Sequence, residues 1–201
     1  MTNERLSRQL HFILEIDKLK GVLRRSLLLD SRRRENSAEH SWHLAMMTLV
    51  LAEHVDEPVD PLHTLKLVLV HDIVEIDAGD TYAYDPDAHT GKNEREQEAA
   101  RRIFGLLPDD QAKELNGLWE EYEGQQTPES RFALALDRLM PLLHNYHSGG
   151  ITWRENRVTS EQVVERMKPV ASSSDALGEA AASVVKQAMA SGLLPDTWSD
   201  P

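Results

Sequence analysis

The chain has 201 residues, enough for one ordinary domain, and its composition of 40% apolar and 28% charged residues is typical of a globular protein. Its formal net charge of −12 argues against binding to duplex DNA or RNA, because such a protein needs a basic face for the phosphates. The absence of Cys excludes a disulfide framework, a thiolate zinc site and a cysteine nucleophile.

The spacing of apolar residues predicts a chain made of helices. The expected helices lie, in chain order, at about residues 4–23, 36–54, 62–76, 92–107, 108–123, 127–146, 160–167 and 174–191. A basic, irregular stretch from Arg24 to Arg34 separates the first two helices, and Asn36 with Glu39 three residues later marks the start of the second. A long loop is expected over 77–91, and loops of this length are usually functional or disordered.

The sequence contains no convincing pair of strands and no internal repeat, so the predicted fold class is all-α, a single helical bundle. We place the helical core in residues 4–148 and interpret residues 149–201 as a C-terminal helical extension of the same domain. The first residues are polar and no apolar run reaches membrane length, so we expect a cytoplasmic protein without a membrane partner.

Two side chains that can bind a metal, His71 and Asp72, lie together near the end of a strongly apolar segment. Burying such groups is costly unless they are paired or coordinate a cation. Glu75 lies four residues after His71 and so projects from a neighbouring part of the helix surface. On its own, however, such a dipeptide is more often an ion-paired helix end.

Two further residues strengthen the metal hypothesis. His40 lies in the first turn of a predicted helix, and Asp137 lies in an apolar stretch, where an acidic residue is unusual unless it is paired or bound. Arg138 could instead pair with Asp137, but adjacent helix positions do not face each other, so we expect that pairing to be poor. Two imidazoles and two carboxylates suit one divalent transition metal (Mn, Co, Fe, Ni, Zn or Cu) better than calcium, and Mg stays open as a further candidate.

These residues follow the order His, then His-Asp, then Asp, and each lies in a longer motif. The motifs are Arg34-Glu35-Asn36-Ser37-Ala38-Glu39-His40-Ser41, His71-Asp72-Ile73-Val74-Glu75, Gly79-Asp80-Thr81, Leu118-Trp119-Glu120-Glu121-Tyr122-Glu123 and Leu136-Asp137-Arg138-Leu139. With these five motifs in order, the chain over roughly 8–146 resembles the HD superfamily of metal-dependent phosphohydrolases, and within it the 5′-deoxynucleotidase branch.

The resemblance implies a role for each matching residue. The metal ligands of the family correspond to His40, His71, Asp72 and Asp137. Glu75 matches the catalytic acid/base, Asp80 matches the aspartate that meets the deoxyribose 3′-hydroxyl, and Thr81 belongs to the same substrate-binding motif. The phosphate-binding arginine corresponds to Arg24 or Arg25, and the sequence does not decide between them. The Trp that can accompany this arginine in the family is absent here, which weakens the expectation of strict selection against ribonucleotides.

The activity implied by the resemblance is removal of the 5′-phosphate from deoxyribonucleoside monophosphates by a metal-activated water, in a protein that is typically a homodimer. A second enzymatic hypothesis is hydrolysis of a larger nucleotide, ppGpp or a cyclic dinucleotide. It is disfavoured because alarmone hydrolases carry an acidic pair where this chain has Glu75-Ile76, and because no further His lies at a suitable place for a second metal. Two non-enzymatic hypotheses, a non-catalytic nucleotide sensor and a structural interaction protein, are disfavoured by the intact ligand set.

The remaining candidates receive weaker interpretations. His43 lies three residues after the first expected ligand, and we interpret it as supporting the ligands or packing rather than as a ligand itself. His144 and His147 are interpreted as surface residues or as partners of a helix dipole. Tyr122 is expected in the core or an interface, and Trp153 is a candidate cover over the site.

Overall fold

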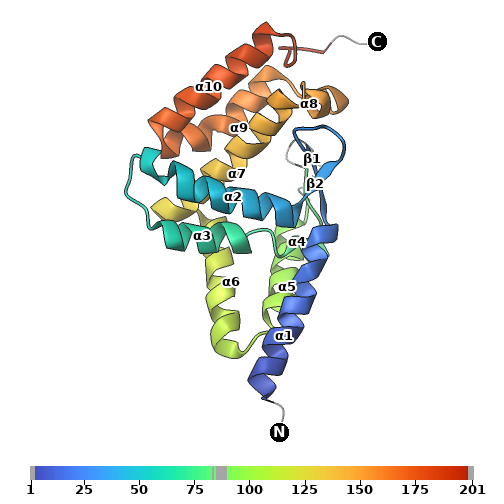
Figure 1. The fold of residues 1–201 in the computed structure, drawn as a ribbon, viewed down its shortest axis with the longest axis vertical. Coiled ribbons are helices and arrows are strands. Elements are labelled where there is room, and N and C mark those ends of the chain that lie inside the picture. Colours follow the sequence, from blue (N-terminus) through green and yellow to red (C-terminus); the bar gives the residue numbers. More distant parts are fainter. Residues whose placement is uncertain (1–2, 83, 85–89, 199–201) are drawn as a thin grey trace.

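Helices make up nearly all of the regular structure in the computed structural model, which describes residues 3–82, 84 and 90–198 (Figure 1). The longer helices are α1 (Glu4–Ile16), α2 (Ser37–Leu51), α3 (Pro61–Val70), α5 (Lys92–Phe104), α6 (Asp109–Gly124), α7 (Pro128–His147), α9 (Ser160–Ser173) and α10 (Asp175–Ala190). The shorter elements are the helices α4 (Glu75–Ala78) and α8 (Ile151–Glu155), the 3₁₀ helices Asp17–Gly21 and Ala52–His54, and the strands β1 (Leu23–Leu27) and β2 (Arg34–Asn36). The predicted all-α class is therefore confirmed, with one small sheet added.

This sheet corrects the expectation that the chain has no strand pair. β1 and β2 run antiparallel, with Leu23 opposite Asn36 and Leu27 opposite Arg34, and the register is irregular between these pairs. Both strands are short and carry charged residues, so they lack the alternation of apolar and polar residues by which a strand is recognised. The first helix is correspondingly shorter than expected, because α1 ends at Ile16 and a 3₁₀ helix leads into β1.

The apolar helix expected over 62–76 is divided into two. α3 ends at Val70, residues 71–74 form turns, and α4 begins at Glu75, so the His71-Asp72 pair lies in a break between helices. Gly79 ends α4 with a φ of +76°, a conformation that glycine adopts without the steric cost of a side chain. The expected loop therefore starts at Gly79, and its residues 83 and 85–89 lie outside the described part.

The long helix α7 organises the molecule. It contacts α2, α3, α6, α9 and α10, and in Figure 1 it lies between the α2–α3 pair and the C-terminal helices. The contact faces are apolar: Leu44 of α2, Leu67 of α3 and Leu136 of α7 are completely buried. Polar side chains on these same inner faces are therefore held in the interior.

The C-terminal helices pack directly on this core. α9 lies against both α7 and α10, and α9 runs on to Ser173, beyond the end expected at residue 167. Gly178 lets α10 approach α9 closely, because a Cβ atom there would lie 2.8 Å from the Cα atom of Ala171. The boundary between a core over 4–148 and an extension over 149–201 stays a prediction. Among the described helices, none has both the length and the apolar character needed to cross a bilayer.

Candidate metal centre and active site

Four side chains from three segments meet in the interior. His40 comes from the first turn of α2, His71 and Asp72 from the break after α3, and Asp137 from the middle of α7, and all four are buried. His40 Nε2 lies 2.8 Å from Asp137 Oδ1, and His71 Nε2 lies 3.0 Å from Asp72 Oδ1. The cross distances are 3.9 Å from His40 Nε2 to Asp72 Oδ2 and 4.0 Å from His71 Nε2 to Asp137 Oδ1. The structure thus brings all four predicted ligands into one cluster.

The donor set of this cluster fits a divalent transition metal. His71 Nδ1 donates a hydrogen bond of 2.9 Å to the carbonyl oxygen of Val68, which leaves Nε2 facing the carboxylates. That buried Nε2 atom lies 3.0 Å from Asp72 Oδ1, but among the described residues it makes no hydrogen bond of suitable geometry. Burial lowers the pKa of His71, but Asp72 beside it outweighs this effect and raises the pKa to about 9. A cation that binds Nε2 therefore displaces a proton.

β1 places its two arginines differently. Arg24 points into the cluster, with Nη1 at 2.8 Å from Asp72 Oδ2 and 3.7 Å from Asp80 Oδ1. Its Nη2 atom lies 3.6 Å from Asp137 Oδ1. Burial lowers the pKa of Arg24, but the surrounding carboxylates outweigh this and raise it above the usual value, so the group stays charged. Arg25 is exposed, and its guanidinium carbon lies 5.7 Å from the ring centroid of Tyr82.

Glu75 lies beside the cluster at the start of α4. Its Oε2 atom accepts a hydrogen bond of 2.7 Å from Ser37 Oγ, and the carboxyl group is buried. Burial raises the pKa of Glu75 well above the usual value, and the charge of Asp72 raises it further. Such a carboxyl group can gain and lose a proton at a higher pH than an exposed glutamate, as an acid/base residue must.

Two adjoining cavities open beside the cluster. One contains His71, Asp72, Glu75 and Asp137, and the other is lined by aromatic and apolar side chains that include Tyr82, Tyr84 and Trp153. Both are lined by Arg24, Asp80, Thr81, Arg138 and Arg166. Asp80 and Thr81 therefore lie where the two cavities meet. Burial raises the pKa of Asp80, against the opposing effect of Arg24.

The structure adds residues that the sequence motifs did not single out. Ser37 holds Glu75, and Arg166 reaches the cavities from α9, far outside the matching motifs. Tyr122 is a core residue, as expected, but it also packs on a predicted ligand, with its ring centroid 4.7 Å from that of His71. The Ser-x-x-His spacing before His40 was a weak local signal for Ser37, whereas nothing local marked Arg166.

Four expectations need correction or refinement. Arg138 does pair with Asp137, Nη1 to Oδ2 at 3.0 Å, because its long side chain can curl back to the preceding residue. His144 is only 5% exposed and so is not a surface residue, whereas His147 is exposed as expected. His43 lies outside the four-ligand cluster and contacts the ring of His144. Trp153 is buried and lines the second cavity as part of its wall.

The fold is helical, and it brings a His, a His-Asp pair and an Asp together around a potential cation site. These features place the chain in a class of metal-binding helical proteins. A family model described as HD domain matches residues 16–177 of this chain. The chain therefore belongs to the HD-domain family, and the resemblance noted in the sequence is confirmed.

Relatives and solved structures agree with this assignment. Human 5′-deoxynucleotidase HDDC2 is 35% identical over 135 residues, which are 67% of this chain and 65% of the human protein. HDDC2 from Danio rerio is 33% identical over 144 residues, or 70% of each chain. The matched region thus spans about two thirds of these curated relatives. A crystal structure of a predicted metal-dependent phosphohydrolase from Magnetospirillum magnetotacticum MS-1 is similar over 96% of both chains, with 50% identity and a TM-score of 0.92.

Proposed function

We propose that this protein hydrolyses the 5′-phosphate ester of deoxyribonucleoside monophosphates. The observation that carries the proposal is the buried four-ligand cluster, with Glu75 and Arg24 lining the same cavity. The relatives named 5′-deoxynucleotidase support the substrate class. We assign the metal-ligand role to His40, His71, Asp72 and Asp137.

The reaction follows from what the side chains can do. A divalent cation in the cluster would supply Lewis-acid stabilisation of the negative charge on the phosphate. Glu75 takes a proton from the attacking water, whose oxygen forms a bond to phosphorus. The bond between phosphorus and the 5′-oxygen breaks, and Glu75 returns the proton to that oxygen. Ser37 keeps the carboxyl group in place through its hydrogen bond to Oε2.

We assign phosphate binding to Arg24, because its planar guanidinium points at the cluster and can donate two parallel hydrogen bonds. Arg25 points away from the cluster and is assigned to the rim of the second cavity. Asp80 accepts a hydrogen bond from the 3′-hydroxyl where the cavities meet, with Thr81 beside it. The nucleoside then occupies the second cavity, between its aromatic side chains.

Arg166 makes the C-terminal extension part of the site. Arg24 and Arg138 already have carboxylate partners, whereas no described residue forms an ion pair with Arg166. Its guanidinium carbon lies 5.7 Å from the ring centroid of Tyr84. Burial lowers the pKa of Arg166 below its usual value, and the charge of Arg138 lowers it further. An arginine without a counter-charge at this position is suited to the phosphate of a nucleotide.

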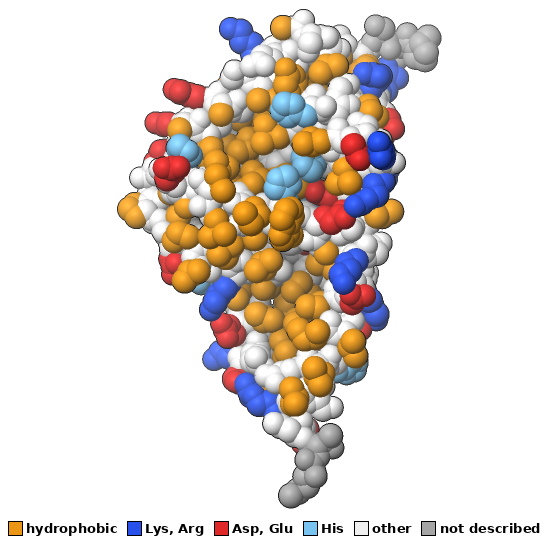
Figure 2. Space-filling model, in the orientation of Figure 1, with side chains coloured by type: hydrophobic (Ala, Val, Ile, Leu, Met, Phe, Trp, Pro, Cys, Tyr) orange, Lys and Arg blue, Asp and Glu red, His pale blue; other side chains and the backbone are white. Residues whose placement is uncertain are grey.

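The homodimer is also a proposal. Figure 2 shows a broad apolar face, and exposed apolar side chains on the three N-terminal α-helices include Leu14 at 73%, Trp42 at 64% and Leu62 at 70%. An apolar surface of this kind is typical of an interface between protein subunits. Light scattering after gel filtration tests it: wild type is expected to elute as a dimer and Leu14→Glu as a smaller species. The cytoplasmic location stays a prediction.

The activity is tested by phosphate release from 5′-dNMPs, 5′-NMPs and 3′-dNMPs in Mn²⁺, Co²⁺, Mg²⁺ and EDTA, with Asp72→Ala as the control. We expect metal-dependent release from 5′-dNMPs that the variant lacks. Equal release of phosphate from ribonucleotides would support hydrolysis of the 5′-phosphate but contradict selection for deoxyribose over ribose. Tight dNMP binding without turnover would favour a sensor. Pyrophosphate release from ppGpp without any dNMP activity would replace the proposal with hydrolysis of a larger nucleotide.

A further inference from the structure

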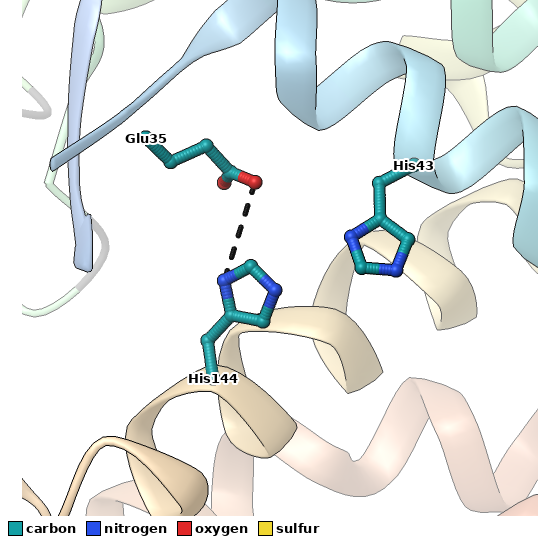
Figure 3. A group of neighbouring side chains, drawn as sticks. All are labelled: Glu35, His43 and His144. Carbon is teal, nitrogen blue, oxygen red and sulfur yellow. Dashed lines mark ion pairs between the residues drawn. The ribbon is translucent and has the colours of Figure 1, made fainter. Parts of the chain in front are cut away.

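A second cluster of polar side chains lies on the far side of the His40 ring. Glu35 from β2 is 1% exposed, and among the described residues its Oε2 atom has no hydrogen-bond partner. His144 from α7 is 5% exposed, and its Nδ1 atom likewise has no partner in the described chain. Figure 3 shows Glu35, His43 and His144 arriving from different segments and pointing into a shared space. Buried polar groups of this kind normally have a partner, so their lack of one needs an explanation.

The two oxygens of Glu35 face different neighbours. Oε2 lies 3.5 Å from His40 Nδ1 and 3.8 Å from Arg24 Nε. Oε1 faces the other way and lies 4.0 Å from His144 Nδ1. A small movement of Oε2 satisfies His40 through an ordinary hydrogen bond. Oε1 and the imidazole of His144 are then left facing each other across a gap.

His43 closes this gap from the third side. It lies one turn after His40 on α2, is half-buried, and has its ring centroid 5.5 Å from that of His144. Glu35, His43 and His144 each offer one ligand atom, and these atoms all lie within 4.8 Å of one another. A direct hydrogen bond between Glu35 and His144 would not involve the ring nitrogen of His43 that lies near them. A single cation with bonds of about 2.0–2.2 Å would satisfy all three after modest side-chain rotation.

We propose that Glu35, His43 and His144 bind a second divalent transition-metal cation. The ligand set of two imidazoles and one carboxylate suits Zn²⁺, Co²⁺, Ni²⁺ or Fe²⁺ and disfavours Ca²⁺ and Mg²⁺, which prefer oxygen ligands. The half-buried ring of His43 provides the route of entry from solvent. This proposal does not depend on the proposed hydrolase activity.

The second cation has a structural consequence for the first cluster. By fixing Oε1, the second cation would hold Glu35 with Oε2 toward His40 Nδ1, which lies 3.5 Å away, so that a small movement would let that nitrogen donate a hydrogen bond to Oε2. His40 Nδ1 is buried and lacks a hydrogen-bond partner within the described residues. A carboxylate behind a metal-binding histidine keeps the hydrogen on the outer nitrogen and orients the ligand nitrogen. Glu35 thus acts as a positioning residue between the two sites.

Metal stoichiometry tests the proposal without an activity assay. The full chain is loaded with Zn²⁺, passed through a gel-filtration column and analysed by mass spectrometry for zinc per chain. Wild type is expected to hold two Zn²⁺ ions per chain. His43→Ala and His144→Gln are expected to hold one, because each removes a ligand of the second site. Asp72→Ala is also expected to hold one, because it disrupts only the first cluster. His147→Ala is the matched control, since this exposed residue lies three positions after His144, and it is expected to hold two.

Two variants guard against a folding defect. His43 is half-buried, so its truncation leaves little cavity, and His144→Gln keeps a polar side chain of similar reach. Without metal, both variants are expected to have the same melting temperature as the wild-type protein. A wild-type protein that holds a single Zn²⁺, or a His43→Ala variant that still holds two, would overturn the proposal.

Discussion

Replacing Arg166 tests whether the C-terminal helices take part in substrate binding. Its guanidinium lines both cavities, and it has no ion-pair partner in the part of the chain that the structure describes. Arg166→Ala is therefore expected to weaken nucleotide binding without disturbing an existing ion pair. The four-ligand cluster and Glu75 lie on other segments, so the chemical step is expected to continue.

The size of the effect follows from the lost interaction. A hydrogen bond to a charged group contributes about 1.5–3 kcal/mol, and each 1.4 kcal/mol is about tenfold in binding. Because Arg166 is only half-buried, solvent screening places the expected loss in the lower half of that range, so we expect KM to rise by about 10- to 40-fold. Arg166→Lys keeps the charge but loses the planar pair of donors, and an intermediate KM is expected.

The assay is steady-state phosphate release at saturating metal, with kcat and KM measured separately. Inhibition by inorganic phosphate reports the same contact independently of turnover. Lys168→Ala is the control, because this exposed residue lies on the same helix and pairs with Glu165 on its surface. A fall in kcat with unchanged KM, or an equal effect in Lys168→Ala, would show that Arg166 acts through the packing of α9 and does not contact substrate.

Three further changes probe the site and the fold. Glu75→Gln is expected to lower kcat by about 10²- to 10⁴-fold at unchanged metal content, and a near-normal kcat would remove Glu75 from the mechanism. Burial already raises the pKa of Glu75, and Ser37→Ala removes a hydrogen bond that lowers it. The acidic limb of the pH–kcat profile is then expected to move to higher pH, and an unmoved limb would argue against this pairing. Gly178→Val places a side chain against Ala171 and is expected to cost about 1–3 kcal/mol in urea unfolding at unchanged KM.

The sequence was most informative where function and local structure coincide. His40, the His71-Asp72 pair and Asp137 stand in short motifs, so their spacing could be compared with a family without any knowledge of the packing. Glu75 belongs to the same motif as the His71-Asp72 pair and shares its environment. Helix starts were also predictable, because the Asn36–Glu39 capping box uses only neighbouring residues.

What the sequence did not predict depends on contacts between distant segments. The choice between Arg24 and Arg25 required β1, because consecutive side chains of a strand point to opposite faces. That strand was missed because charged side chains hide its alternation. Arg166 comes from a helix with no motif of its own, and its place at the site follows only from the packing of α9 on α7.

The same limit explains the buried cluster behind His40. Glu35, His43 and His144 come from β2, α2 and α7, and Glu35 and His144 are separated by more than a hundred residues. A histidine near a helix end is usually a surface residue, whereas the packing of α7 in the core leaves His144 buried. Tertiary structure therefore changes the chemistry of a residue whose local sequence looks ordinary.

A metal ion and the proton of His71 would compete for the same place beside the buried carboxylate of Asp72. We therefore expect the stability of the metal-free protein to fall as the pH rises. Without a cation, the carboxylate of Asp72 raises the pKa of His71 from 6.5 to about 9 despite the opposing effect of burial. When folding raises the pKa of a group, the group stabilises the folded protein. This stabilisation is complete below the pKa of the group in the unfolded chain, and it is lost as the pH rises through the pKa in the folded protein. In EDTA, stability is therefore expected to fall between about pH 6.5 and 9, by an amount on the order of 3 kcal/mol.

In the metal-loaded protein, a cation at the proposed site would take the place of the His71 proton, so we expect this loss to be absent. The difference in melting temperature between metal-loaded and EDTA-treated protein is therefore expected to widen as the pH rises from 6.5 to 9. Thermal melts at four pH values across this interval measure it, with Asp72→Ala as the control that removes both the carboxylate and the raised pKa. A difference that stays constant with pH in wild type would mean that His71 does not exchange a proton for the metal. The cation would then have to bind elsewhere than at Nε2, and the proposed ligand set would be wrong.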